Sequence, residues 1–301
     1  MAVMTWKKLE DLVAEGRGQG HRDRYKPWIR IHRRNASARG NQITDALPGY
    51  RRASHFLAAV EWHIALLCLY LGAWDVREQF PLWPMPHLHP LQDLDAGVAR
   101  PRMRGLLEIA DETGIDHGVE AGSKGVPYVA TLDLNVTLRI AGSFRIAGVS
   151  VKPHKEVRDA EPTDRVVERL ELERRYLVEA EAQHIIVERD LLGFHAGGNL
   201  ETFSSGARLP AHLTLGQRAQ DFSARLVELS QHSSIYAAIK RVGNEMNLSE
   251  ADANLMWRNG VWTRRIDLDI TAPLELNRPL RLDGRHMATA LALQLFGEVA
   301  A

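Results

Sequence analysis

Residues 126–153 read VPYVATLDLNVTLRIAGSFRIAGVSVKP, and this stretch decides the fold. Two runs rich in β-branched and aromatic residues lie on either side of Gly142, so they predict two neighbouring strands. Successive side chains of a strand point to opposite faces of its sheet, so Ser150 and Lys152 share a face. The first strand carries a carboxylate, Asp133, and the second therefore presents a polar residue and a lysine beside it.

A carboxylate on one strand, with a polar residue and a lysine two positions apart on the next, is the arrangement of PD-(D/E)xK nuclease sites. In such a site the carboxylate holds Mg²⁺, and the lysine offers positive charge to the attacking water and the phosphorane. Ser150 stands where an acid or an amide is usual. The competing interpretation is a solvated lysine beside a strand-edge aspartate, because this spacing occurs by chance in many sheets.

The flanking sequence favours the nuclease interpretation. Helical periodicity and a strand-like run precede the quoted stretch, and a strong helix and a short apolar strand follow it. Strand, helix and strand with this spacing form a right-handed crossover unit. The predicted ranges are helix 54–71, strands 74–80, 128–138 and 144–152, helix 164–181 and strand 184–188. This order, αβββαβ, predicts an α/β fold with the core of restriction-endonuclease-like proteins.

A second carboxylate, Glu61, falls inside the apolar stripe of the first predicted helix. A buried carboxylate is unfavourable unless it is paired or bound to a metal, so Glu61 is a candidate metal ligand. The alternatives are a stripe-edge glutamate that reaches water, or an ion pair with Arg51 or Arg77. The same reasoning applies more weakly to Glu173, for which a salt-bridged helix position is the more common role.

Several blocks of sequence resemble, in order, the TnsA family of heteromeric-transposase endonucleases. GRGQG and the following YKPW are similar to the opening motif of that family, VREQFPL to the strand after its first helix, VKP to its catalytic strand and LELERRY to the next helix. A less specific block near the end is similar to the family's C-terminal winged-helix segment. The blocks occupy residues 16–20, 25–28, 76–82, 151–153, 170–176 and 247–268.

The resemblance implies specific roles for residues of this chain. Glu61 and Asp133 would be its metal ligands, and Lys152 its catalytic lysine. The glutamine of the family falls on Ser150, which is the remaining implied catalytic position, and the main-chain carbonyl of Val151 is an alternative metal ligand. The implied cofactor is Mg²⁺, with Mn²⁺ as a substitute. Because Mg²⁺ tolerates several water ligands, we expect Ser150 to weaken the site rather than abolish it.

Composition limits the class of protein. The chain has 301 residues, which is enough for two domains at the usual size of about 150 residues each. Its single cysteine, Cys68, excludes an intramolecular disulfide and a cysteine-based zinc site. The first ten residues already carry two lysines with no apolar region after them, and no apolar run is long enough to span a bilayer. We therefore expect a cytoplasmic protein without a membrane partner.

The net charge is zero, but it is unevenly distributed. Residues 1–55 contain twelve Lys and Arg against five Asp and Glu, an excess of seven positive charges, with aromatic residues interleaved. Such a basic arm predicts contact with a phosphate backbone. The alternatives are a solvated terminus or an arm that docks on another protein.

The sequence divides into three parts. Residues 1–191 form the predicted PD-(D/E)xK-like endonuclease domain with its basic arm, and the Gly/Ser-rich segment 192–209 is the predicted linker. Residues 210–301 are predicted to form a winged-helix-like domain, which could bind DNA or dock a protein. Its expected elements are helices 215–231 and 234–244, a helix that begins at Ser249, and wing strands 262–270 and 274–282.

These observations predict a Mg²⁺-dependent DNA endonuclease that cuts the 5′, non-transferred strands at transposon ends. By resemblance its partners are a TnsB-like transposase and a TnsC-like ATPase regulator. One alternative is a stand-alone restriction-type nuclease, which needs a base-reading surface that the sequence does not nominate. Another is a catalytically weakened assembly and DNA-docking subunit, which the serine at position 150 makes conceivable.

Overall fold

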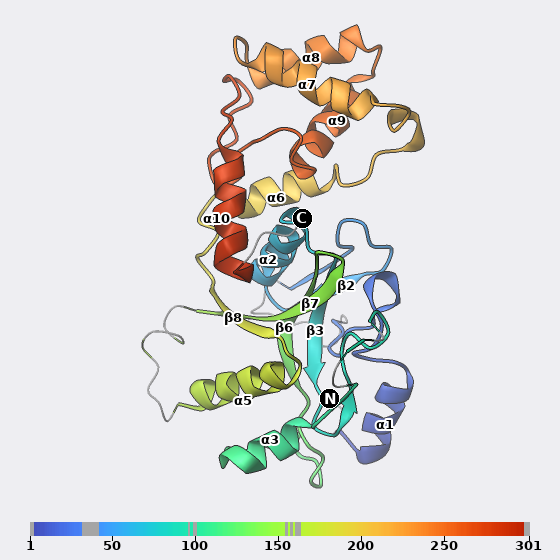
Figure 1. Cartoon of the computed structure of the whole chain (residues 1–301), viewed down its shortest axis with the longest axis vertical. Coiled ribbons are helices and arrows are strands. Elements are labelled where there is room, and N and C mark those ends of the chain that lie inside the picture. The colour runs from blue at the N-terminus through green and yellow to red at the C-terminus, as the bar shows by residue number, and fades with distance from the viewer. Residues whose placement is uncertain are drawn as a thin grey trace.

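A four-stranded sheet lies at the centre of the structure (Figure 1). In spatial order it contains β3 (Asp75–Leu82), β6 (Ala130–Ile140), β7 (Ser143–Lys152) and β8 (Gln183–Glu188). The β3–β6 and β6–β7 pairs are antiparallel, and β8 runs parallel to β7. The computed structural model describes residues 3–31, 42–95, 97–98, 101–153, 156, 159 and 164–297.

The predicted αβββαβ order is present. Helix α2 (Ala59–Tyr70) precedes β3, and α5 (Arg165–Glu179) connects β7 to β8. The β6–β7 hairpin closes through two residues, Ala141 and Gly142, which both have positive φ angles, 48° and 87°. This is the backbone that a tight hairpin turn requires. The mixed sheet with helices is compatible with a restriction-endonuclease-like fold.

The first helix begins later than predicted. Residues 54–56 form strand β2 (Ser54–Phe56), which pairs with β1 (Ile43–Asp45). Ser54 and Phe56 are fully buried, and the His55 main-chain N–H donates to the Glu78 carboxylate on β3. Tertiary contact with β3 therefore overrides the helical pattern in this segment.

The two faces of the sheet are covered by different helices (Figure 1). One core contains α2 together with Val136 and Val149 of the sheet. The other core contains Leu172 and Leu177 of α5 with Ile146 of the sheet, and it includes helix α3 (Leu106–Thr113). The remaining short elements are α1 (Trp6–Ala14), η1 (Arg22–Arg24), β4 (His87–Leu88), β5 (Arg102–Met103) and η2 (Ala211–Leu213).

The segment predicted as a linker, 192–209, is a packed element instead. It contains helix α6 (Ala196–Ser204), in which Ala196, Leu200 and Phe203 are buried. Their spacing of four and three residues gives the helix one apolar face, which the neighbouring Gly and Ser residues obscured in the sequence. The Phe203 ring packs edge-on against Trp257, with ring centroids 5.7 Å apart.

The last third of the chain is helical. Helices α7 (Arg218–Ser230), α8 (Ile235–Glu245) and α9 (Glu250–Trp262) lie where helices were predicted, and Ser249 caps α9 by accepting the Asp252 N–H. The predicted wing strands are wrong in the part of the chain that the structure describes. Residues 262–282 contain only an isolated bridge between Leu268 and Leu282.

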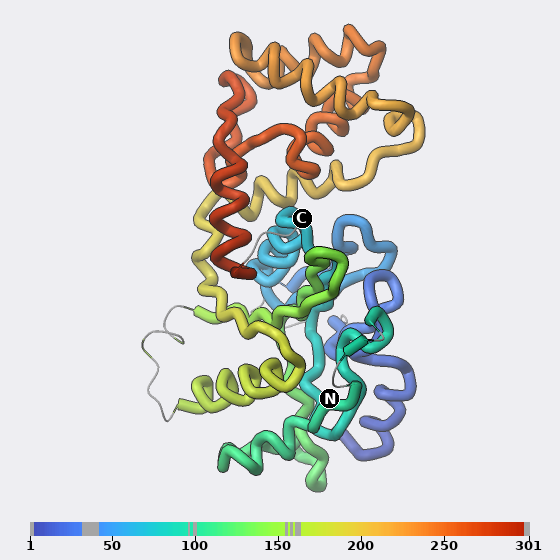
Figure 2. Tube along the Cα trace, viewed as in Figure 1, coloured from blue at the N-terminus to red at the C-terminus, as the bar shows by residue number. Residues whose placement is uncertain are grey.

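A further helix, α10 (Gly284–Phe296), follows the bridge, so a winged helix is not confirmed. Pro273 and Pro279 have no main-chain N–H to donate to a strand ladder, which is a physical reason for the missing wing. Figure 2 shows α10 running from the helical last third of the chain toward the sheet, where it contacts β8. One continuous core joins these helices to the sheet, from Leu47 to Phe296. None of the described helices is long and apolar enough to cross a bilayer.

We expect Phe203→Ala to lower the free energy of unfolding by about 3–5 kcal/mol, because it removes a buried ring from this shared core. Urea unfolding, followed by tryptophan fluorescence and far-UV circular dichroism, should show a single transition at lower urea. The matched control is Phe194→Ala, since Phe194 is 93% exposed and its loss should change stability by less than about 0.5 kcal/mol. Two separate transitions, of which only one moves, would contradict a shared core.

Candidate active site

The β3–β6 pairing is interrupted at one level of the sheet. The register skips a single opposed pair, Gln79 and Asp133, and Gln79 has a left-handed φ of 48°. Leu132 belongs to the core under α5 and Leu134 to the core under α2, although residues two apart on a regular strand share a face. The interruption therefore releases Asp133 from the regular alternation of β6.

Asp133 lies beside the end of β7, as the sequence predicted. Its Oδ2 accepts the Val151 main-chain N–H at 2.7 Å, and the Lys152 Nζ is 3.9 Å from the same oxygen. Burial raises the pKa of Asp133 above its ordinary value, while the Lys152 charge and the Val151 N–H oppose that rise. Asp133 and Lys152 thus form a close pair in a partly desolvated position.

Glu61 projects from the first turn of α2 and is only 7% exposed. Its Oε2 accepts the Leu57 main-chain N–H at 3.0 Å and the Gln79 side-chain amide at 3.3 Å. Burial, together with the negative charge of Asp133, raises the pKa of Glu61 to about 8. The two carboxylates, predicted from separate motifs, are therefore electrostatic neighbours.

The two carboxylates share a pattern of hydrogen bonds. In each, a main-chain N–H holds one oxygen, Oε2 of Glu61 or Oδ2 of Asp133. The second oxygen of each group accepts no hydrogen bond from the described residues. Two neighbouring acids with raised pKa values and free oxygens are a site that a cation would stabilise.

The donor set fits Mg²⁺. Within the described residues, no group of three or more His, Cys, Asp and Glu is arranged to hold a metal ion. Zinc sites usually need three or four such side chains, whereas Mg²⁺ is often bound by one or two carboxylates and keeps several waters. Glu61 and Asp133 with water ligands would therefore suit Mg²⁺ and would not suit zinc.

The side chain of Ser150 contacts one residue of α5 and one of β8. Its Oγ donates to Glu173 Oε2 at 2.6 Å and lies 3.0 Å from His184 Nε2. Burial alone would raise the pKa of Glu173, but hydrogen bonds from His184 and Ser150 lower it below its ordinary value. The charge of Glu173 in turn raises the pKa of Asp133, so this cluster lies next to the carboxylate pair.

A catalytic role for Ser150 stays a prediction, as does a metal contact by the Val151 carbonyl. Three neighbours of the site were not predicted from the sequence. Gln79 binds Glu61, the Arg189 charge lowers the pKa of Glu61, and the Arg169 charge lowers that of Asp133. Only Gln79 had a sequence signal, because it lies in the VREQFPL block.

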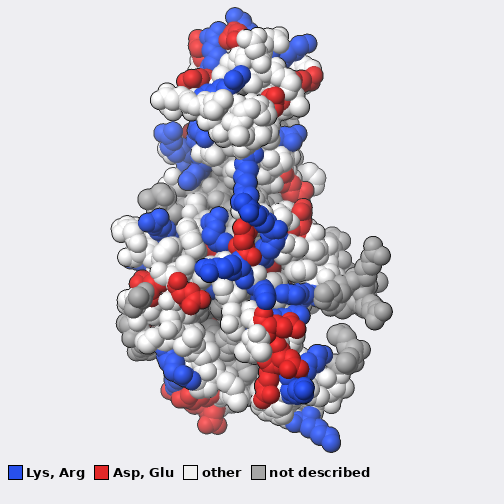
Figure 3. All heavy atoms as spheres, turned by 90° about the vertical axis from the view of Figure 1, so that its right-hand side faces the viewer, with Lys and Arg blue, Asp and Glu red and all other residues white. Residues whose placement is uncertain are grey.

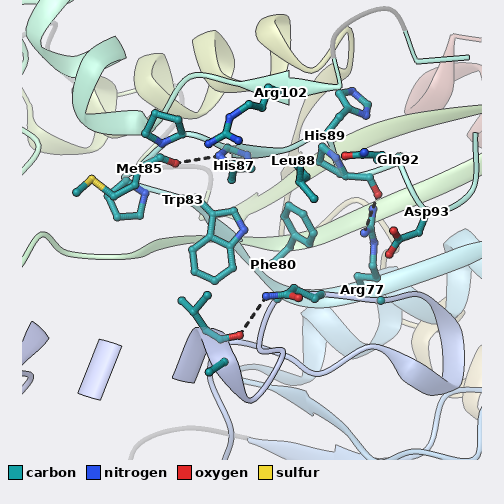
Figure 4. A pocket seen from close by; sticks show the side chains of 18 of the residues that line it. Arg77, Phe80, Trp83, Met85, His87, Leu88, His89, Gln92, Asp93 and Arg102 are labelled. Carbon is teal, nitrogen blue, oxygen red and sulfur yellow. Dashed lines mark hydrogen bonds between the residues drawn. The ribbon is translucent and has the colours of Figure 1, made fainter. Parts of the chain in front are cut away.

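A cavity in the N-terminal part of the chain lies away from these residues. It has a volume of about 740 Å³ and is bounded by α1, the GRGQG loop and residues 83–93. Figure 4 shows that aromatic and proline-rich surfaces, including Phe80 and Trp83, form much of its wall. None of the four predicted catalytic residues lines it.

The raised pKa of Glu61 predicts a pH-dependent stability in the metal-free protein. Between its ordinary pKa of 4.5 and about 8, the folded state keeps a proton that the unfolded state releases. The free energy of unfolding should therefore fall as pH rises from about 5 to about 8. In Glu61→Gln the fall should be smaller, because the amide does not titrate. Urea unfolding of both proteins in EDTA at several pH values measures the difference, and parallel curves would contradict the assignment.

Comparison with known proteins supports the predicted resemblance. No family model matches the chain. A curated relative, the transposon Tn7 transposition protein TnsA of Escherichia coli, is 31% identical over 172 residues, which are 54% of this chain and 50% of that protein. The chain thus spans about half the length of the curated relative it matches. The resemblance inferred from the sequence blocks is confirmed: the chain is similar to TnsA over the matched region.

Proposed function

We propose that the chain is a Mg²⁺-dependent DNA endonuclease that cuts the 5′, non-transferred strands at transposon ends. The observation that carries the proposal is the placement of Lys152 beside Asp133, with the buried Glu61 as electrostatic neighbour. The similarity to a transposition protein supports the substrate class. In this proposal a TnsB-like transposase cuts the other strands, and a TnsC-like ATPase regulates the assembly.

In this proposal the carboxylates bind the metal and the lysine stabilises the transition state. Glu61 and Asp133 would hold Mg²⁺, which when bound activates water and neutralises the leaving 3′ oxygen. The main-chain N–H groups of Leu57 and Val151 orient the two carboxylates by holding one oxygen of each. Lys152 would donate to the non-bridging phosphate oxygens as negative charge develops on them.

Positive charge near the carboxylate pair would help to receive a phosphate backbone. Arg169 and Arg189 are close enough to lower the pKa values of Asp133 and Glu61, respectively. Figure 3 shows Lys and Arg side chains gathered in a band across the middle of one face of the molecule. A cleft of about 610 Å³ in the N-terminal part is lined by Asp23, Arg24, Tyr25, Lys26, Pro27, Arg30, Arg52, Ala53 and His55.

Some basic residues of the predicted arm form hydrogen bonds within the protein. The Arg52 guanidinium donates to both oxygens of Glu78, at 2.6 and 2.8 Å, and the Lys26 ammonium donates to the Glu15 carbonyl at 2.6 Å. Arg33, Arg34 and Arg39, which the prediction included, lie outside the described residues. DNA contact through the described part of the arm would therefore fall to more exposed groups such as Arg24.

The weakened-subunit alternative also has an observation in its favour. Ser150 and Glu173 bind each other at 2.6 Å. A Glu173 carboxylate that already accepts from Ser150 has less capacity to bind a second cation. The enzyme proposal therefore rests on one cation at Glu61 and Asp133.

We expect Asp133→Ala and Lys152→Ala each to reduce strand cleavage by on the order of 100-fold or more, because each removes a group that would act on the transition state. The substrate is a transposon-end duplex labelled on both strands, incubated with Mg²⁺ and with the transposase and the ATPase. Asp45→Ala and Lys124→Ala are matched controls, since both residues carry the same charge as the residue they control for and are exposed. Undiminished 5′-strand cleavage by Asp133→Ala would overturn the site.

The same assay separates the alternatives. We expect the unaltered chain alone to cleave poorly, because a net charge of zero gives little non-specific affinity for DNA. Efficient, site-specific double-strand cleavage by the isolated chain would instead indicate a restriction-type nuclease. Cleavage confined to the 3′ strands in the complete mixture, with assembly intact, would indicate a subunit kept for docking.

A further inference from the structure

Gln79 combines three properties that are unusual in one residue. It is 1% exposed, it has a left-handed φ of 48°, and it lies opposite Asp133 where the β3–β6 register is interrupted. A left-handed backbone is uncommon for a residue with a long side chain and persists only when the surroundings enforce it. The contacts of the Gln79 backbone and of its side chain therefore identify what holds this conformation.

The N-terminal segment holds the backbone of Gln79. The Trp28 main-chain N–H donates to the Gln79 carbonyl at 3.2 Å, and the Tyr25 hydroxyl lies 3.5 Å from the same oxygen. The Tyr25 hydroxyl also donates to the Glu78 carbonyl at 2.9 Å. The YKPW block thus hydrogen-bonds to β3 at this residue. The sequence alone did not predict this contact.

The side chain of Gln79 reaches the carboxylate pair. Its Nε2 donates to Glu61 Oε2 at 3.3 Å, and its Oε1 accepts the Thr131 hydroxyl at 3.4 Å. Because the Glu61 carboxylate accepts, the N–H end of the Gln79 amide faces it, and the Thr131 hydroxyl contacts the other end. Because Leu57 N–H and Gln79 both hold Oε2, the other oxygen of Glu61 is left without a hydrogen bond from the described residues.

We propose that Gln79, held in its left-handed conformation by the Tyr25–Trp28 segment, is a positioning residue that orients Glu61 to bind the divalent cation. This inference rests on the proposed function, because it requires a cation at Glu61 and Asp133. Gln79 itself is not a ligand: its amide nitrogen and oxygen are both committed to protein partners. Groups that orient a metal ligand commonly change metal affinity by about 10–100-fold when they are removed.

Two substitutions remove the amide donor, one that keeps the strain of the left-handed backbone and one that relieves it. Gln79→Met keeps a side chain of similar length but removes the N–H donor. Gln79→Gly also removes the donor, but it relieves the left-handed backbone, so its metal-free melting temperature offers a check that the fold survives. Ala141→Gly is the matched control, because Ala141 has the same φ of 48° and is exposed in the β6–β7 turn.

The probe is Mn²⁺ alone, titrated into each protein by calorimetry. We expect both Gln79 variants to bind Mn²⁺ about 10–100-fold more weakly than the unaltered chain. Ala141→Gly should bind it as the unaltered chain does. In the complete cleavage mixture, the Mg²⁺ concentration for half-maximal cleavage should rise by the same factor, with little change in the rate at saturating Mg²⁺. A purely structural role would not produce that split.

The possible results distinguish this inference from the proposed function. If Glu61→Gln weakens Mn²⁺ binding and neither Gln79 variant does, Gln79 is not a positioning residue and the metal site stands. If the unaltered chain binds no Mn²⁺, the metal site itself is contradicted and the inference is overturned with it.

Discussion

The placement of two desolvated carboxylates near one another is the constraint on which this site depends. Glu61 and Asp133 come from different elements, α2 and β6, and each is desolvated enough for its pKa to rise. Two such acids destabilise one another unless protons or a cation neutralise them. The fold holds them together nevertheless, with a main-chain N–H on each and Lys152 near one of them.

The surrounding structure supplies the rigidity that this arrangement needs. The two-residue turn at Ala141 and Gly142 sets the register of β6 against β7, and so brings Asp133 to the Val151 N–H. The interruption of β3 at Gln79 brings an amide to Glu61. Helices α6 to α10 share one core with α2 and the sheet. The helix that carries Glu61 therefore packs against both the sheet and these helices.

Local patterns predicted the centre of the fold and the carboxylate pair, because both depend on short-range periodicity. The alternation of side chains along the strands predicted the β6–β7 hairpin that carries Asp133 and Lys152. The apolar stripe of the first predicted helix made Glu61 a candidate ligand. The errors arose where distant contacts decide. Residues 54–56 became a strand against β3, residues 196–204 became a packed helix, and residues 262–282 formed no wing. The Ser150 contact with Glu173 and His184 likewise joins three elements, which spacing along the chain does not reveal.

We propose that Glu61 and Asp133 together bind one divalent cation. The most direct test is the anomalous diffraction signal from crystals of the unaltered chain soaked in MnCl₂. We expect a peak within coordination distance of both carboxylates, on the side of the oxygens that accept no hydrogen bond from the described residues. A peak elsewhere, or both carboxylates well ordered with no peak between them, would contradict it.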